Sequence, residues 1–119
     1  MRDPNTMERL EHVIGLLRRR TLNGSLEWRV RHSSRPSFTT STPSASFVLM
    51  DETMSSPRLR LTLQVMDEHG DVVESYRTGS DGGRWGSFDE QLDELFTVVQ
   101  KQTSRTNDVL DRVIRDLSI

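Results

Sequence analysis

Residues 79–86 form the segment of this sequence whose composition comes closest to that of a chemical site. Half of its residues are glycine, and Arg84 and Trp85 precede a predicted helix. Free N–H groups at a helix start, together with Arg84, are able to hold an anion. The segment lacks the Gly-Lys-Ser/Thr ending of a phosphate-binding loop, and no parallel strand–helix–strand unit surrounds it. We therefore expect a strand-to-helix connection, with Trp85 as a candidate partner contact because tryptophan is a frequent binding hot spot.

Arginine is concentrated near the first predicted helix and the strand after it. Arg18, Arg19 and Arg20 end the helix, whereas Arg29 and Arg31 alternate along the strand. If these five side chains converge, they form a basic face for a phosphate backbone. We favour capping and solvation of the helix end instead, because the net charge is −2 and no aromatic residues interleave with the arginines.

Acidic and histidine side chains gather at one predicted turn, over residues 67–71. Their spacing matches neither the calcium loop nor the zinc signatures, so an ordinary polar hairpin is expected. For His12 and His32, the sequence supplies neither an activated nucleophile nor an orienting third group. Cysteine is absent, which excludes disulfides, thiolate zinc ligands and thiol catalysis. We predict no catalytic residue, no metal and no cofactor.

Apolar residues at helical spacing predict the helices that would position these side chains. One helix is expected over about 6–22, and two more over about 88–102 and 107–117. We favour a break near Thr106-Asn107, with one continuous helix as the alternative. Ser87 and Glu90 have the spacing of a capping box at the start of the second helix.

Alternating apolar and polar residues predict strands over about 25–32, 37–42, 46–51, 58–67 and 71–77. The strand over 58–67 has the clearest alternation and is expected at the centre of the sheet. The strand over 37–42 lies between prolines and is expected at an edge. Disorder over 33–46 is the alternative for that region. Trp28 alternates in phase with Leu26 and Val30, so it is expected in the core.

These elements predict a single α+β domain over residues 1–119. We expect an antiparallel sheet of four to five strands, packed on one face by the N-terminal and C-terminal helices. A chain of 119 residues has the length of one ordinary domain. No apolar run approaches the roughly 18 residues of a membrane span, and residues 1–5 lack the apolar core of a signal peptide. We therefore expect a cytoplasmic protein with no membrane partner.

The motif Gly24-Ser25-Leu26-Glu27-Trp28 follows the first helix and precedes a β-meander and an acidic, capped helix. In this order of elements the chain resembles small uncharacterised domains of bacteria, often high-GC actinobacteria, and of their phages. The likeness covers most of the chain. It implies the same fold and brings no assigned activity with it.

Charge is distributed unevenly along the chain. Residues 1–60 hold ten arginines and six acidic residues, whereas residues 61–119 hold six basic and twelve acidic residues. Such polarity favours association with a partner, and the apolar stripes of the terminal helices could pair between subunits. We expect a non-enzymatic protein-interaction or adaptor module that forms a homodimer. The alternatives are a nucleic-acid-associated regulator that uses the arginines, and a small-ligand binder or small enzyme.

Overall fold

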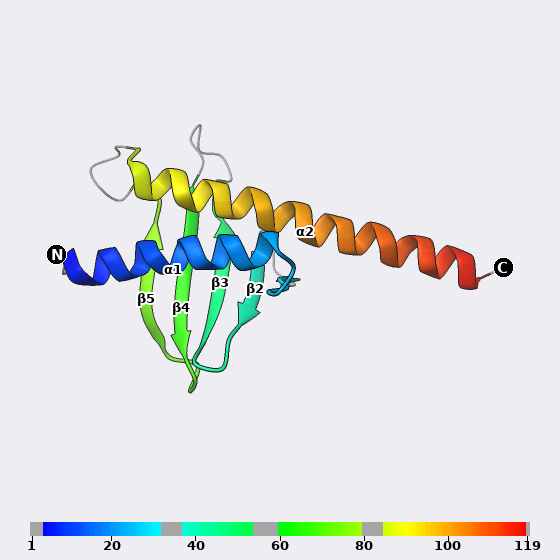
Figure 1. Ribbon diagram of the computed structural model, residues 1–119, viewed down its shortest axis with the longest axis horizontal. Helices are drawn as coiled ribbons and strands as arrows, with labels where there is room; N and C mark the ends of the chain where they lie inside the picture. The colour runs from blue at the N-terminus through cyan, green and yellow to red at the C-terminus, as the bar shows by residue number, and fades with distance from the viewer. Residues whose placement is uncertain (1–3, 32–36, 54–59, 80–84, 119) are drawn as a thin grey trace.

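Two helices and five strands make up the protein in the computed structural model, which describes residues 4–31, 37–53, 60–79 and 85–118. The strands form one antiparallel sheet in the order β1-β2-β3-β4-β5, and both helices cover the same face of it (Figure 1). The predicted α+β class is confirmed. In chain order the elements are α1 (Pro4–Leu22), β1 (Arg29–Val30), β2 (Ser37–Ser41), β3 (Ala45–Asp51), β4 (Leu61–Asp67), β5 (Val72–Arg77) and α2 (Ser87–Leu117).

The register of the strands separates a face toward the helices from an outer face. One row across the sheet pairs Phe38 with Leu49, Leu49 with Leu63, and Leu63 with Tyr76. All four side chains are buried against the helices. Side chains alternate between the two faces of a strand, so the adjacent row, which contains Thr39, lies on the outer face.

The two helices run side by side in the same direction. Gln91 Nε2 donates to Glu11 Oε1 at 2.8 Å, and about three turns further along both helices, Gln102 Nε2 lies 3.5 Å from the carbonyl oxygen of Thr21. Their apolar faces meet the sheet to form the core. The buried apolar side chains of the helices are Leu10, Ile14 and Leu17 of α1, with Phe88, Leu92, Leu95, Phe96 and Val99 of α2.

Strand β1 is shorter than the predicted strand over 25–32. Only Arg29 and Val30 pair with β2. The backbone before them is bonded to the side chain of Gln102, which accepts from the N–H of Trp28 at 2.8 Å and donates to the carbonyl oxygen of Leu26 at 2.7 Å. A side chain of α2 thus replaces the sheet as hydrogen-bond partner. Trp28 is buried, as predicted, and its indole N–H donates to Thr21 Oγ1 at 2.9 Å.

Two predictions about strand positions are wrong. Strand β2 is not at the edge of the sheet, because β1 pairs with it on the side away from β3. The central strand is β3 rather than β4. The alternative of disorder over 33–46 is wrong for residues 37–46, which form β2, a hydrogen-bonded turn and the start of β3, while residues 33–36 lie outside the described residues. Alternation along a strand reports which face is buried and contains no information on its position in the sheet.

Helix α2 is continuous from Ser87 to Leu117, so the break favoured near Thr106-Asn107 is wrong. Thr106 Oγ1 donates to the carbonyl oxygen of Gln102 at 3.1 Å, a bond inside the helix rather than a cap for a new one. The predicted cap at Ser87 is also displaced by one residue. Gly86 is the N-cap, and its N–H donates to Asp89 Oδ2 at 2.9 Å.

Candidate interaction surface

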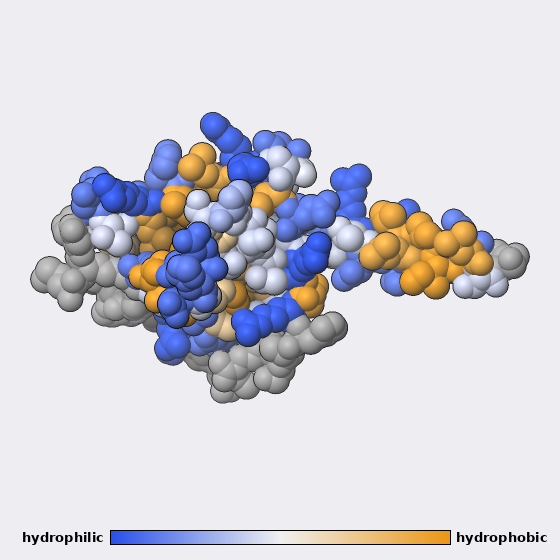
Figure 2. All heavy atoms as spheres, turned by 90° about the horizontal axis from the view of Figure 1, so that it is seen from below, coloured by the Kyte–Doolittle hydropathy of each residue, from blue (hydrophilic) through white to orange (hydrophobic). Residues whose placement is uncertain are grey.

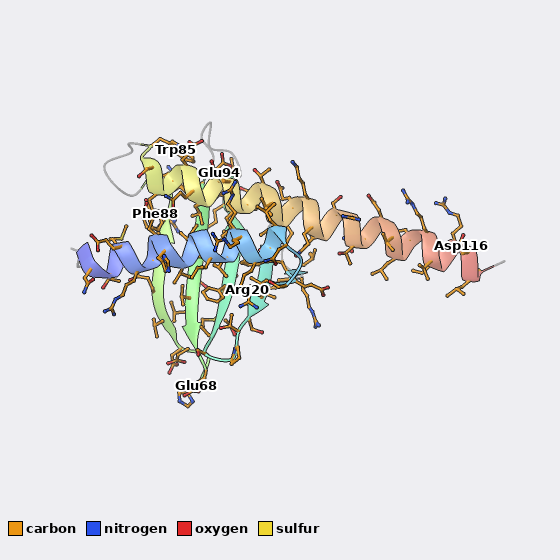
Figure 3. All side chains as sticks on the ribbon, in the orientation of Figure 1. Arg20, Glu68, Trp85, Phe88, Glu94 and Asp116 are labelled. Atoms are coloured by element: carbon orange, nitrogen blue, oxygen red, sulfur yellow. The ribbon has the colours of Figure 1, made fainter. Side chains whose placement is uncertain are left out.

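The three arginines that end α1 lie on the helical side of the molecule. All three are exposed. Arg18 Nε lies 3.8 Å from Glu94 Oε2 across the seam between the helices, and Arg20 Nε donates to Ser25 Oγ at 3.2 Å. Arg18 therefore contributes to helix packing and Arg20 to the turn after α1; Figure 3 labels Arg20 near the end of α1 and Glu94 on α2.

Arg29 and Arg31 lie on the outer face of the sheet. Arg29 pairs with Thr39, whereas the intervening Val30 pairs with Phe38 of the core. Both arginines are exposed. The structure thus places these two on the opposite side of the sheet from Arg18, Arg19 and Arg20, and the five predicted arginines do not meet on one face.

Trp85 lies at the start of α2, at the edge of the described residues (Figure 3). Its side chain is 45% exposed, and the indole N–H donates to Glu90 Oε2 at 2.9 Å. An exposed tryptophan with its N–H bonded within the chain offers its ring edge and face to a partner. Arg84, the other candidate in this segment, lies outside the described residues.

The acidic turn between β4 and β5 uses its first carboxylate for its own backbone. Asp67 Oδ1 accepts from the N–H of His69 at 2.9 Å and from the N–H of Asp71 at 3.0 Å. Gly70 has a φ of +86°, which is the left-handed conformation that glycine adopts at no steric cost. The part of the chain that the structure describes contains no group of three histidine or acidic residues able to hold a metal. His12 is exposed on α1, and His32 lies outside the described residues.

Asp89 is a buried carboxylate that the sequence analysis did not single out. It is 2% exposed and accepts from the hydroxyl of Tyr76 at 2.7 Å and from the N–H groups of Gly79 at 3.3 Å and Gly86 at 2.9 Å. These bonds join the end of β5 to the start of α2. The available signal was an acid three residues after Gly86, the spacing of an N-terminal cap.

Acidic side chains are dense on the first turns of α2 that follow Asp89. Burial raises the pKa of the Asp93 carboxyl above its ordinary value of 3.8, and the negative charges of Glu90 and Glu94 raise it further. The negative charge here suits the positive end of the helix dipole.

An open apolar groove of about 380 Å³ lies between α1 and the turn that joins β2 to β3. Its apolar lining comes from Val13, Leu16, Leu17, Leu26 and Phe47. Leu16 is 41% exposed, so the groove is a surface feature. Between the helices and the sheet, the apolar side chains of both helices and of β2 to β5 form one core cluster.

Among the residues that the structure describes, the largest group of exposed apolar side chains belongs to the C-terminal part of α2. We refer to residues 104–117 as the α2 tail. The tail projects past β2 and the end of α1 (Figure 1), and Figure 2 shows its apolar side chains gathered together beyond the body of the protein. Their exposed fractions lie between 43% and 80%, for Val109, Leu110, Val113, Ile114 and Leu117.

The apolar stripe of the tail continues the buried face of α2. Leu92, Phe96, Val99 and Thr103 are buried at spacings of four, three and four residues. The same alternation of four and three continues through Thr106, Leu110, Val113 and Leu117, so all eight residues lie on one side of the helix. The face that the sheet and α1 cover as far as Thr103 is therefore uncovered beyond it.

The polar side of the tail has balanced charge. It contains three arginines and three aspartates, at positions 105, 112 and 115 and at positions 108, 111 and 116. A basic polar side would be expected of a helix that binds an anionic membrane or a nucleic acid. Mixed charge beside an apolar stripe is typical of a helix that packs against protein.

Comparisons of the chain with protein-family models, with curated proteins and with solved structures found no match. The resemblance to bacterial and phage domains therefore stays a prediction. Within the described residues, no helix is both long enough and apolar enough to cross a membrane.

Proposed function

We propose that this protein is a non-enzymatic protein-interaction module that binds its partner through the apolar stripe of the α2 tail. The observation that carries the proposal is the continuity of one helix face. That face is buried as far as Thr103 and exposes five large apolar side chains after it. Contiguous apolar patches of this kind on a soluble domain mark interaction sites.

The helical conformation of the tail supports a state in which a partner covers its apolar stripe. A free helical segment of about 14 residues is marginally stable in water, because nucleation is unfavourable and packing supplies most helix stability. The tail is attached to a packed helix and so needs no new nucleus. Its distal turns still lack tertiary contacts, and a partner that covers the stripe would supply them.

Paired substitutions of matched exposure test the proposal. In the tail variant, Leu110→Asp/Ile114→Asp, the altered side chains are 53% and 62% exposed. In the control variant, Val72→Asp/Val73→Asp, they are 53% and 60% exposed and lie on β5, far from the tail. Circular dichroism and the melting temperature establish that both variants are folded.

The measurement is affinity capture by tagged wild-type protein and by both variants, with quantification by mass spectrometry. We expect proteins, including untagged copies of this chain, that the wild type and the β5 control retain and the tail variant loses. Identical retention by all three proteins would refute the proposal.

A further inference from the structure

We propose that the partner of the α2 tail is the α2 tail of a second copy of this chain, packed antiparallel about a two-fold axis between residues 113 and 114. This inference rests on the proposed function and names the occupant of the same surface. The evidence comes from three properties of the described residues: the symmetry of the stripe, the charges on its flank, and the space that the body of the protein occupies.

The apolar stripe is its own complement when the helix direction is reversed. Reversal about the midpoint between residues 113 and 114 places Leu110 opposite Leu117 of the second copy. It also places Val113 opposite Ile114 of the second copy. A two-fold interface requires such a self-complementary surface. The pairing buries all four of the side chains that form the distal stripe.

Charge on one flank of the stripe fits the same register. Arg112 and Asp116 are one turn apart and share a side of the helix with Val109: Asp116 lies at the margin of the stripe, and the long Arg112 side chain starts further round, on the polar side. A two-fold axis perpendicular to the helices brings this margin against the same margin of the second copy. Arg112 then lies within one residue of Asp116 of the second copy, and symmetry generates the pair twice. Figure 3 shows Asp116 near the end of the tail, away from the sheet and α1.

The body of the protein excludes the parallel alternative. In a parallel, in-register pair, residues 92–103 of the second copy would lie against the face of α2 that α1 and the sheet already cover. In the antiparallel pair, the second copy's helix ends before it reaches Thr103. The two bodies then lie at opposite ends of the paired tails, where neither obstructs the other.

The size of the stripe is sufficient for a weak to moderate dimer. The four stripe side chains of each copy, together with Val109 beside them, bury on the order of 1,000 Å² in total, which is the lower bound for a specific interface. We therefore expect a dimer whose population depends on protein concentration.

Sedimentation equilibrium over a range of concentrations tests the association. Wild-type protein is expected to change from its chain mass of 13.7 kDa to twice that mass. Leu110→Asp/Ile114→Asp is expected to raise the dissociation constant at least about 100-fold, because charge would be buried in an apolar contact. Val72→Asp/Val73→Asp is expected to leave it unchanged. A wild-type protein that stays monomeric at all concentrations would overturn the inference.

Charge reversal tests the register. Arg112→Asp and Asp116→Arg, each alone, are expected to weaken the dimer about three- to tenfold, since each removes both symmetric pairs and opposes like charges. The double variant Arg112→Asp/Asp116→Arg is expected to restore the wild-type constant. Failure of the double variant to restore association would refute the proposed register.

Disulfide formation tests the direction of the helices, since the native chain has no cysteine. A mixture of Leu110→Cys and Leu117→Cys chains is expected to form mixed disulfides, whereas Leu117→Cys alone is not. Self-pairing of Leu117→Cys would indicate parallel helices and overturn the inference. A monomeric wild type whose tail still captures other proteins would refute the second copy as partner and leave the proposed function standing.

Discussion

The two parts of α2 have the same amphipathic pattern and opposite environments. Residues 87–103 bury their apolar side against α1 and the sheet, whereas residues 104–117 expose the same side to solvent. At about 1.5 Å per residue, the 31 residues of α2 span about 46 Å. Five strands about 4.8 Å apart extend only about 19 Å from first to last. The helix is therefore longer than the surface that covers it. An apolar stripe in a sequence shows that a helix has a packing face, and it does not show which part of the structure covers that face.

The largest expected effect is on the free energy of unfolding, and it compares one leucine in the buried part of α2 with one in the tail. Leu92 is fully buried, and Leu110 occupies an equivalent helix position with 53% of its side chain exposed. Leu92→Ala is expected to lower the free energy of unfolding by about 2–5 kcal/mol. Leu110→Ala, at a concentration where the chain is monomeric, is expected to change it by less than about 0.5 kcal/mol. Urea titration measures both. Equal losses would mean that the tail packs within its own chain.

Asp89 fixes the start of the packed part, and its removal is the second test. Asp89→Ala leaves the hydroxyl of Tyr76 and the N–H groups of Gly79 and Gly86 without their acceptor. Hydrogen bonds to charged groups are worth more than neutral ones, so we expect a loss of about 2–3 kcal/mol in urea titration.

Asp108→Ala in the tail is the control for this change, because Asp108 is exposed. It is expected to have no measurable effect on the monomer. A stable Asp89→Ala variant would show that α2 starts correctly without this carboxylate.

Gln102 lies where the packed part ends. Its side chain bonds the backbone of Leu26 and Trp28, so Gln102→Ala is expected to lower the free energy of unfolding by about 1–2 kcal/mol. It is also expected to speed amide hydrogen exchange at Trp28. The exposed Gln100→Ala is the matched control. Unchanged exchange at Trp28 would contradict the bonding role given to Gln102.

The smallest effect is a dependence on pH in the packed part. The pKa of Asp93 is raised in the folded state, so the ionised carboxylate destabilises the fold at neutral pH. As pH falls below 3.8, the group is protonated in both states and the destabilisation disappears. Asp93→Asn is expected to raise the melting temperature by about 1–2 °C at pH 7, with the gain shrinking toward pH 3. A gain that is the same at both pH values would contradict this cause.

Sequence reasoning predicted the secondary structure well where the periodicity was clear. Helix α1 and strands β3 to β5 lie close to the expected ranges, and Trp28 is in the core. One error occurs where a side chain far away in the sequence satisfies the backbone: Gln102 replaces sheet partners for Leu26 and Trp28. Another is local, because Thr106 bonds to the preceding turn of the helix that was expected to break.

The candidate site was predicted less well than the fold. The arginines that were selected by composition lie on opposite sides of the sheet, because Arg29 is in register with Thr39 of the outer face, whereas Val30 is in register with Phe38 of the core. Asp89 was missed because an acid near a helix start is ordinary in sequence, and only its burial makes it distinctive.

The sequence by itself determined which side of each element is apolar, because side-chain periodicity is local and follows from helix and strand geometry. Only the tertiary structure decided which of those sides are covered. How much of α2 is covered depends on the width of the sheet, on where α1 ends, and on how far α2 extends beyond the sheet and α1. Those are distances between elements remote in the chain, and no local pattern contains them.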